Sequence, residues 1–230
     1  MPSLTKILYY LGSALATAIA VGIIGYGMSQ QWSETAIRCS GMDTVVGNGS
    51  AVVMLKLFRG SLQRFSCPHF GTSENFDVIP RLLGSTTPVV LHSLVLFLLV
   101  LSLVCSAITI LVSLYNSVSN PYETYMGPTA IYVCSSLSAC LSVLGLILFA
   151  VNISATDMAE ELAKSSTGSL QVTLHEKSTQ MLLGFYLVIP YTVLSLVAIL
   201  LIYLYDHAAY TQRTQQQRPT QDAPKEIMMY

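Results

Sequence analysis

Four long apolar runs alternate with polar segments along this chain. They cover residues 7–28, 89–114, 129–151 and 181–205, and each exceeds the roughly 18 residues with few charges that a transmembrane helix requires. Helices of these lengths rise roughly 33 to 39 Å, which is enough to cross a hydrocarbon core of about 30 Å. The pattern therefore predicts four membrane-spanning helices.

The first run has the alternative interpretation of a cleaved signal peptide. Lys6 precedes it, and the small residues Ala16 and Ala18 lie within it. Its apolar stretch is longer than the roughly 7 to 15 residues of a signal-peptide core. We therefore expect this run to remain as the first transmembrane helix.

Small and hydroxylated side chains recur at helical spacing within the runs. They are Ala14, Ala18 and Gly22 in the first run, Ser102, Ser106 and Ser113 in the second, and Cys134, Ser138 and Ser142 in the third. Lipid provides no hydrophobic drive between helices, so association depends on close packing and on hydroxyl hydrogen bonds. We expect these faces at helix contacts, and we expect Pro190 to kink the fourth helix.

The polar segment 29–88 is too long for a simple connection and predicts structure of its own. Apolar and β-branched residues cluster at 44–46 and 51–58, on either side of the turn-rich sequence 47–50. We expect a small antiparallel sheet with Asn48 at a turn. In the second loop, 152–180, Leu170, Val172 and Leu174 alternate with polar residues, which predicts a further strand of the same sheet.

Composition supports the membrane class. Apolar residues make up 53% of the 230 residues and charged residues 10%, and the mean hydropathy is +0.59. These values are typical of a multi-pass membrane protein and exclude an ordinary soluble domain. The fold class that follows is all-α in the membrane with a small extracellular β-sheet.

Charge counting does not orient the chain. Most of the 11 Lys and Arg residues lie in the loops that follow the first and third helices, so the positive-inside rule does not support cytosolic termini. Cysteines and a glycosylation sequon in the first loop favour the oxidising side of the membrane. We therefore expect loops 29–88 and 152–180 outside, and the ends 1–6 and 206–230 and the turn 115–128 in the cytosol.

Two modifications are predicted in the first loop. Cys39 and Cys67 form a candidate disulfide, and the alternative is two free thiols. By lowering the entropy of the unfolded chain, this disulfide would raise the free energy of unfolding by about 3.5 kcal/mol on the loop-entropy model. Asn48 begins the sequon Asn48-Gly49-Ser50 and is the candidate glycosylation site. A second sequon at Asn152 lies too near the membrane for use. Cys105, Cys134 and Cys140 lie in the runs and are interpreted as packing residues.

Catalytic and transport chemistry is not indicated. The four runs contain essentially no ionisable side chain apart from His92, which we expect to be interfacial and not part of a proton relay. Cys67-Pro68-His69 lacks the second ligand pair of a zinc site, and no phosphate loop or nucleophile elbow occurs. We predict no enzyme activity, metal, cofactor, nucleic acid or small-molecule substrate.

The tail 206–230 is rich in Gln, Thr and Pro, which predicts disorder. It ends in Met228-Met229-Tyr230. A PDZ domain could bind this end by strand addition and carboxylate capture, although three residues also match by chance.

With these residues in view, the chain resembles the clarin family, most of all its third paralogue, within the wider claudin-like group of four-helix membrane proteins. The resemblance runs nearly end to end and is carried by Met1-Pro2-Ser3, Trp32, Leu57-Phe58-Arg59-Gly60, Asn116, Asn120-Pro121-Tyr122-Glu123-Thr124, Gly127-Pro128, Leu148-Phe149-Ala150, Glu160-Glu161-Leu162 and Met228-Met229-Tyr230.

The chain departs from the claudin-like pattern in the first loop. Lys56 and Phe58 flank Leu57 where that pattern has Gly-Leu-Trp, and Cys39 precedes this position instead of following it. The disulfide geometry of the wider group therefore does not transfer.

The resemblance implies a left-handed four-helix bundle under an extracellular sheet, without catalysis. It also implies a role in organising membrane complexes and the actin cytoskeleton in sensory hair cells and their synapses.

Two functions follow as hypotheses. The first is a plasma-membrane organiser of other membrane proteins, which uses the sheet outside and the tail inside, the latter for a PDZ-domain or cytoskeletal protein. The alternative is a subunit of a channel or transporter complex. A tetraspanin is disfavoured because the large loop comes first and lacks a Cys-Cys-Gly motif.

Overall fold

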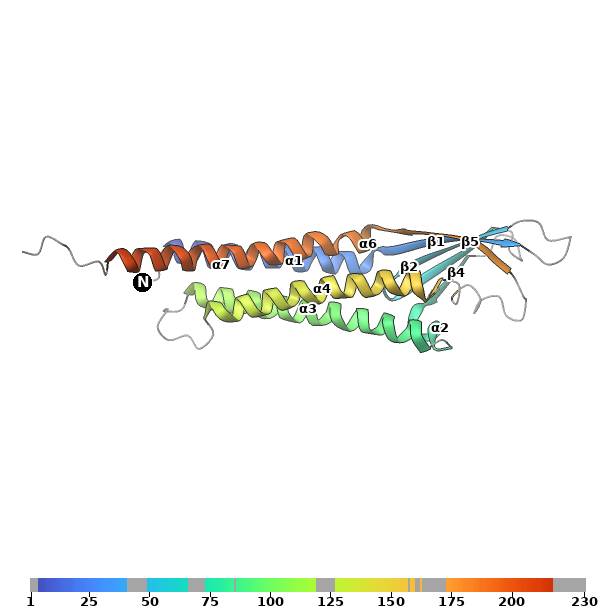
Figure 1. Ribbon diagram of the computed structural model, residues 1–230, viewed down its shortest axis with the longest axis horizontal. Helices are drawn as coiled ribbons and strands as arrows, with labels where there is room; N and C mark the ends of the chain where they lie inside the picture. The colour runs from blue at the N-terminus through green and yellow to red at the C-terminus, as the bar shows by residue number, and fades with distance from the viewer. Residues whose placement is uncertain are drawn as a thin grey trace, which may run out of the picture.

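The structure is a computed structural model that describes residues 4–40, 49–65, 73–84, 86–118, 127–156, 158, 159, 162 and 173–216. Four long helices lie side by side, and a sheet extends beyond one end of the bundle (Figure 1). The first helix begins and the last helix ends at the opposite end. The molecule is therefore an elongated helical bundle with a β-cap.

The four long helices confirm the predicted spans. They are α1 (Leu4–Ser29), α3 (Thr86–Val118), α4 (Pro128–Ala155) and α7 (Val188–Gln216). All are long and apolar enough to cross a membrane. In the bundle α3 packs against α4 and α1, and α7 packs against α1 and α4.

The helices expose apolar side chains on their outer surface and bury hydroxyl groups among apolar residues inside. Large apolar side chains such as Leu15, Val104 and Leu196 are exposed, whereas Ser13, Ser102 and other hydroxyl-bearing residues are buried. Lipid is the solvent for the exposed positions, and hydroxyls are stable inside because they find partners there. The structure and sequence together define a multi-pass membrane protein.

The fourth run differs from its prediction at both ends. A strand continues to Met181, and a short helix α6 (Leu183–Tyr186) precedes α7, so Pro190 lies in the first turn of α7 and does not kink it. A proline there is tolerated because its missing N–H would have no intrahelical acceptor.

The predicted disorder of 206–230 is wrong for its first part, since α7 continues to Gln216. Thr211 and Thr214 donate hydrogen bonds to carbonyls four residues back, which continues the helix. The other transmembrane helices are somewhat longer than predicted.

The cap is one antiparallel sheet with the order β4-β3-β2-β1-β5. Its strands are β1 (Gln31–Ser40), β2 (Gly49–Lys56), β3 (Arg59–Phe65), β4 (Ser73–Asp77) and β5 (Thr173–Met181). The pairing of β5 with β1 confirms that the second loop joins the sheet of the first loop. The sequence predicted β2 and the start of β5 but missed β1, β3 and β4.

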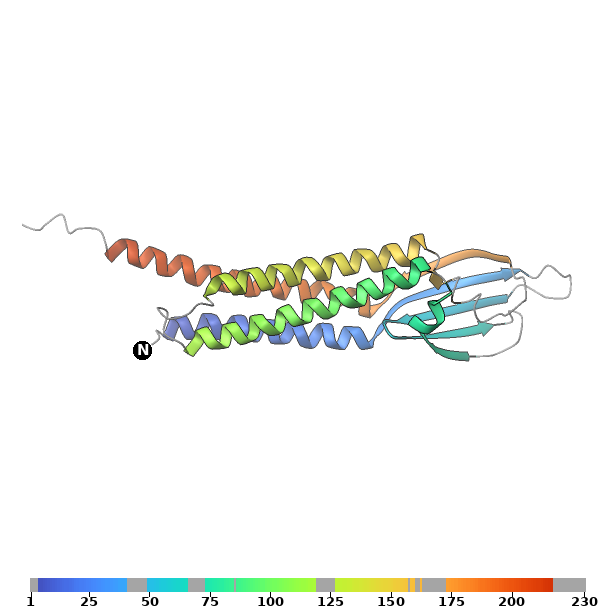
Figure 2. The same ribbon diagram turned by 90° about the horizontal axis from the view of Figure 1, so that it is seen from below.

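A short helix, α2 (Val78–Leu82), links the sheet to the bundle. It follows β4 directly and contacts both β4 and α3 (Figure 2). The backbone N–H of Val78 donates to the carbonyl of Phe58 at 3.1 Å, which ties α2 to the turn between β2 and β3. The buried side chains of this region form one apolar cluster that continues into the helices.

Candidate interaction surface

The two faces of the sheet differ in polarity. Strand register aligns Thr35, Val53 and Leu62 across β1, β2 and β3, and Val53 and Leu62 belong to the apolar cluster. The alternate side chains lie on the opposite face, which we call the open face. Its members include Glu34, Ala36, Arg38, Val52, Met54, Lys56, Ser61, Gln63, Asn75, Ser178 and Gln180, all exposed or half-buried.

Trp32 fastens the sheet to the bundle. Its indole Nε1–H donates to the carbonyl oxygen of Gly27 at 2.9 Å, and its ring meets Phe149 edge-on with centroids 5.1 Å apart. The carbonyl of Trp32 accepts the backbone N–H of Leu182 at 2.9 Å. One fully buried residue therefore contacts or bonds to α1, α4 and the end of β5.

His92 makes a second connection. It lies near the sheet end of α3 and is 1% exposed, and its Nε2 is 2.8 Å from the carbonyl oxygen of Leu57. The turn between β2 and β3 covers the ring, so the side chain is buried in protein at this end of α3. The contact ties this turn to α3.

Close packing holds the far strands. A Cβ at Gly60 would overlap the ring of Phe76 on β4, so only glycine fits without adjustment. The guanidinium of Arg81 lies 4.9 Å from the Phe76 ring centroid, and its Nη1 is 2.6 Å from Oε1 of Glu74. Helix α2 and strand β4 are thereby fixed together.

Hydroxyl groups form a polar seam at the centre of the bundle. The hydroxyl of Tyr191 on α7 lies 2.8 Å from that of Ser106 on α3, bonds to that of Ser138 on α4, and donates to the carbonyl of Ser102 at 3.1 Å. The hydroxyl oxygens of Ser106 and Ser138 are 3.0 Å apart. The seam joins three helices. Ser106 and Ser138 therefore lie at helix contacts, as the spacing of the serines predicted.

Other members of the predicted faces behave differently. The hydroxyls of Ser142 and Thr192 are 3.0 Å apart and join α4 to α7. Ser113 is buried and has no hydrogen-bond partner among the described residues. Sequence reasoning did not identify Tyr191, because a single tyrosine beside Pro190 gives no signal of burial.

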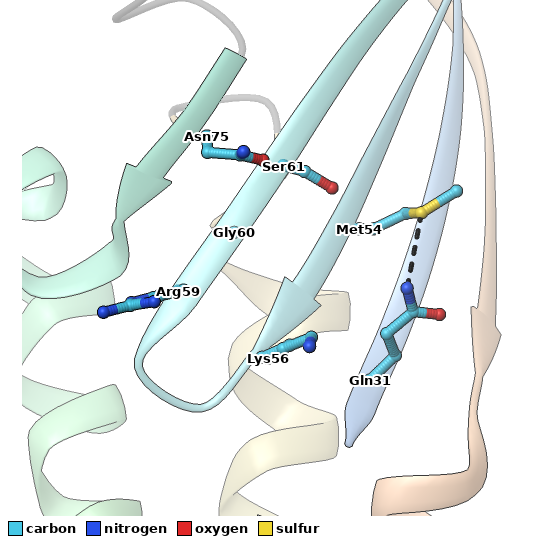
Figure 3. Close-up of a pocket in the computed structure, with 7 residues that line it drawn as sticks. All are labelled: Gln31, Met54, Lys56, Arg59, Gly60, Ser61 and Asn75. Atoms are coloured by element: carbon cyan, nitrogen blue, oxygen red, sulfur yellow. Dashed lines mark hydrogen bonds between the residues drawn. The ribbon is translucent and has the colours of Figure 1, made fainter. Parts of the chain in front are cut away.

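The open face is hollowed where the strands meet the bundle. The hollow has a volume of about 250 Å³ and is lined by Gln31, Met54, Lys56, Arg59, Gly60, Ser61 and Asn75 (Figure 3). The Nε2 of Gln31 is 3.7 Å from the sulfur of Met54. Cations, amides and a hydroxyl make this hollow suited to a polar or anionic group, and sequence reasoning did not identify it.

The predicted modification and binding residues lie largely outside the described part of the chain. The backbone of Cys39 belongs to β1, opposite Gly49 and Leu174, while its side chain, Cys67, Asn48 and Met228-Met229-Tyr230 are outside the described residues. Cys105 is buried, Cys134 is half-buried and Cys140 is exposed, so Cys140 lies on the lipid side and not in a packed interface. The described residues contain no cluster of three metal-ligating side chains.

Comparison with known proteins covers the whole chain. The family described as Clarin-2-like matches residues 4–202. The chain is similar to Clarin-3 of Mus musculus (30% identity over 234 residues) and of Homo sapiens (31% over 239 residues), with 100% of each chain covered. Clarin-1 of Homo sapiens is 26% identical over 188 residues, with 78% of this chain and 80% of the relative covered.

Proposed function

Because this chain belongs to the clarin family, we propose that it organises membrane protein complexes and catalyses no reaction. The observation that supports this function is the open face of the sheet. No described element packs on this face, although the opposite face is joined to the bundle through Trp32 and His92. A rigid polar surface held above the membrane suits contacts with neighbouring membrane proteins.

The proposed orientation has the sheet outside the cell and both termini in the cytosol, with the four helices in a claudin-like bundle in the plasma membrane. The even number of spans supports termini on the same side. The cysteines and the sequon of the first loop support the extracellular side.

Glycosidase treatment tests this orientation. A gel shift of the wild-type protein that is absent in Asn48→Gln is the expected result. Cells that glycosylate a control protein but leave this chain unshifted would contradict the placement of the sheet.

Partner contacts are tested on the open face itself. Ser61→Arg and Gln63→Arg change exposed or half-buried side chains without touching the apolar cluster. We expect both variants to reach the cell surface and to lose cross-linked membrane partners. The matched control is Val104→Leu, on the lipid side of α3. Retention of every partner by both arginine variants would refute the role of the sheet.

The intracellular half of the proposal concerns the tail. We propose that Met228-Met229-Tyr230 binds a PDZ-domain or cytoskeletal protein, in keeping with a role in sensory cells. Deletion of these three residues should abolish that binding and leave the extracellular contacts intact.

The alternative of a channel or transporter subunit is less well supported. The hydroxyls of Ser106, Ser138 and Tyr191 bond to one another and fill the centre of the bundle. Ion or solute flux into liposomes that contain this protein alone would favour the alternative over the organising role.

A further inference from the structure

The hollow on the open face lies at the level of a lipid headgroup layer. Tyr26 on α1 and Tyr186 on α6 are 57% and 54% exposed, and exposed tyrosines at helix ends mark the boundary of the hydrocarbon. Gln31 follows Tyr26 by five residues: α1 continues to Ser29 and β1 begins at Gln31, so the rise is between roughly 5 and 11 Å. The headgroup layer on each side of a bilayer is roughly 5 to 8 Å thick. We therefore place Gln31 and the hollow beside it within the headgroup layer or at its outer edge.

Among the described residues, no acidic side chain lines the hollow. Lys56 is exposed, and the described residues provide no ion-pair partner for it. Nε of Arg59 is 3.8 Å from Oδ1 of Asp77, but these side chains are 82% and 70% exposed, so the pair contributes little. Glu34 lies in the next row of the open face, beside Met54, and outside the hollow. The hollow itself retains positive charge.

The neutral groups around these cations complete a donor set. The amides of Gln31 and Asn75 and the hydroxyl of Ser61 line the same hollow, which Figure 3 shows between the lower ends of the strands. Ammonium, guanidinium, amide and hydroxyl groups are the donors that a phosphodiester accepts from proteins. A volume of about 250 Å³ leaves room for a phosphate group.

An apolar group stands beside the cations. Phe58 lies between Lys56 and Arg59 in the chain, at the turn of β2 and β3, and is 54% exposed, whereas Leu57 is fully buried. Exposed aromatic and cationic side chains together are typical of contacts with the membrane interface.

We propose that this hollow binds the phosphate of a phospholipid headgroup from the leaflet on the sheet side of the membrane. Lys56 pairs with the phosphate, the amides and Ser61 donate to its oxygens, Arg59 adds positive charge at the rim of the hollow, and Phe58 contacts the lipid nearer its chains. The site does not depend on the organising role, and it would exist whichever way the protein is oriented.

Native mass spectrometry of the purified full chain tests the site. Dioleoyl phosphatidylglycerol is the probe, and dioleoylglycerol, which lacks the phosphate, is the control lipid. We expect the phospholipid to bind at least about tenfold more tightly to the wild type than to the double variant Lys56→Gln, Arg59→Gln. Dioleoylglycerol should not distinguish the two proteins.

Two further variants distinguish specific binding in the hollow from nonspecific attraction to positive charge on the protein. Arg38→Gln removes one positive charge at the far end of β1 on the same face, and the affinity of this variant should stay within about twofold of the wild type. Lys56→Arg keeps the charge and should retain binding, which also gives a readout if the double variant fails to fold.

Three results would overturn the proposal. One is equal phospholipid binding by the wild type and by Lys56→Gln, Arg59→Gln. Another is an equal loss in Arg38→Gln. The last is displacement of the lipid by millimolar inorganic phosphate, which would make the hollow a site for a free anion.

Discussion

Gly184 lies directly against the indole ring of Trp32, and no side chain fits between them. A Cβ at Gly184 would be 2.6 Å from Nε1 of Trp32 and 2.9 Å from the carbonyl oxygen of Gln31. This contact brings α6 against the start of β1, where the sheet leaves the bundle.

Gly184→Ala should therefore destabilise the protein by about 1 to 3 kcal/mol, because one methyl group overpacks a fixed junction. Reversible unfolding in detergent micelles measures the change. Gly22→Ala is the matched control, since its Cβ would meet nothing within 4 Å. Equal stability of the two variants would show that the junction adjusts freely.

Trp32→Phe removes the hydrogen bond to Gly27 and leaves a space beside Phe149. We expect a loss of about 1 to 3 kcal/mol in the free energy of unfolding. Tyr26→Phe changes an exposed aromatic side chain on α1, next to Gly27, and its free energy of unfolding should lie within about 0.5 kcal/mol of the wild type. If Trp32→Phe left the free energy of unfolding unchanged, the hydrogen bond of the indole nitrogen would not hold the sheet to the bundle.

Tyr191→Phe removes the hydroxyl that joins three helices. Because hydroxyl bonds within membranes are modest, the expected loss is about 0.6 to 1.5 kcal/mol. Ser138→Ala removes part of the same network, so the double variant should lose less than the sum of the single losses. Strict additivity in this double-mutant cycle would refute the shared seam, and Tyr203→Phe provides an exposed control.

Gly60→Ala forces a methyl group into the ring of Phe76. The variant should lower the melting temperature, and Phe76→Leu in the same chain should recover part of the loss because the smaller side chain yields space. Circular dichroism of both variants checks this. If Phe76→Leu worsened the melting temperature of Gly60→Ala further, β3 and β4 would not pack as described.

The pattern of apolar and polar residues predicted the parts of this fold that depend on long apolar runs or on regular alternation. Four runs of apolar residues were sufficient for the spans, and simple alternation revealed β5. Strand β1 was missed because its covered face uses Ser33 and Thr35, both buried, so the apolar and polar positions do not alternate. Strand β3 was missed because Gly60 occupies a covered position where a large apolar residue would give the signal.

The hollow and the Trp32 junction were beyond sequence reasoning for a different reason. Gln31, Lys56, Arg59 and Asn75 come together only through the register of four strands. Register depends on turns and bulges, such as the shift between Gln31 and Ser33, that composition does not determine.

The sheet is assembled from both halves of the chain, and this has a consequence for biosynthesis. Strand β1 lies between β2 and β5, and β5 is made only after α4. Until β5 has been synthesised, β1 is therefore an unpaired edge strand, and its backbone N–H and C=O groups on that side can pair with any other strand. Translation that stops between α4 and β5 would leave that edge permanently exposed, so an early stop there produces an aggregation-prone chain and not merely a shorter one.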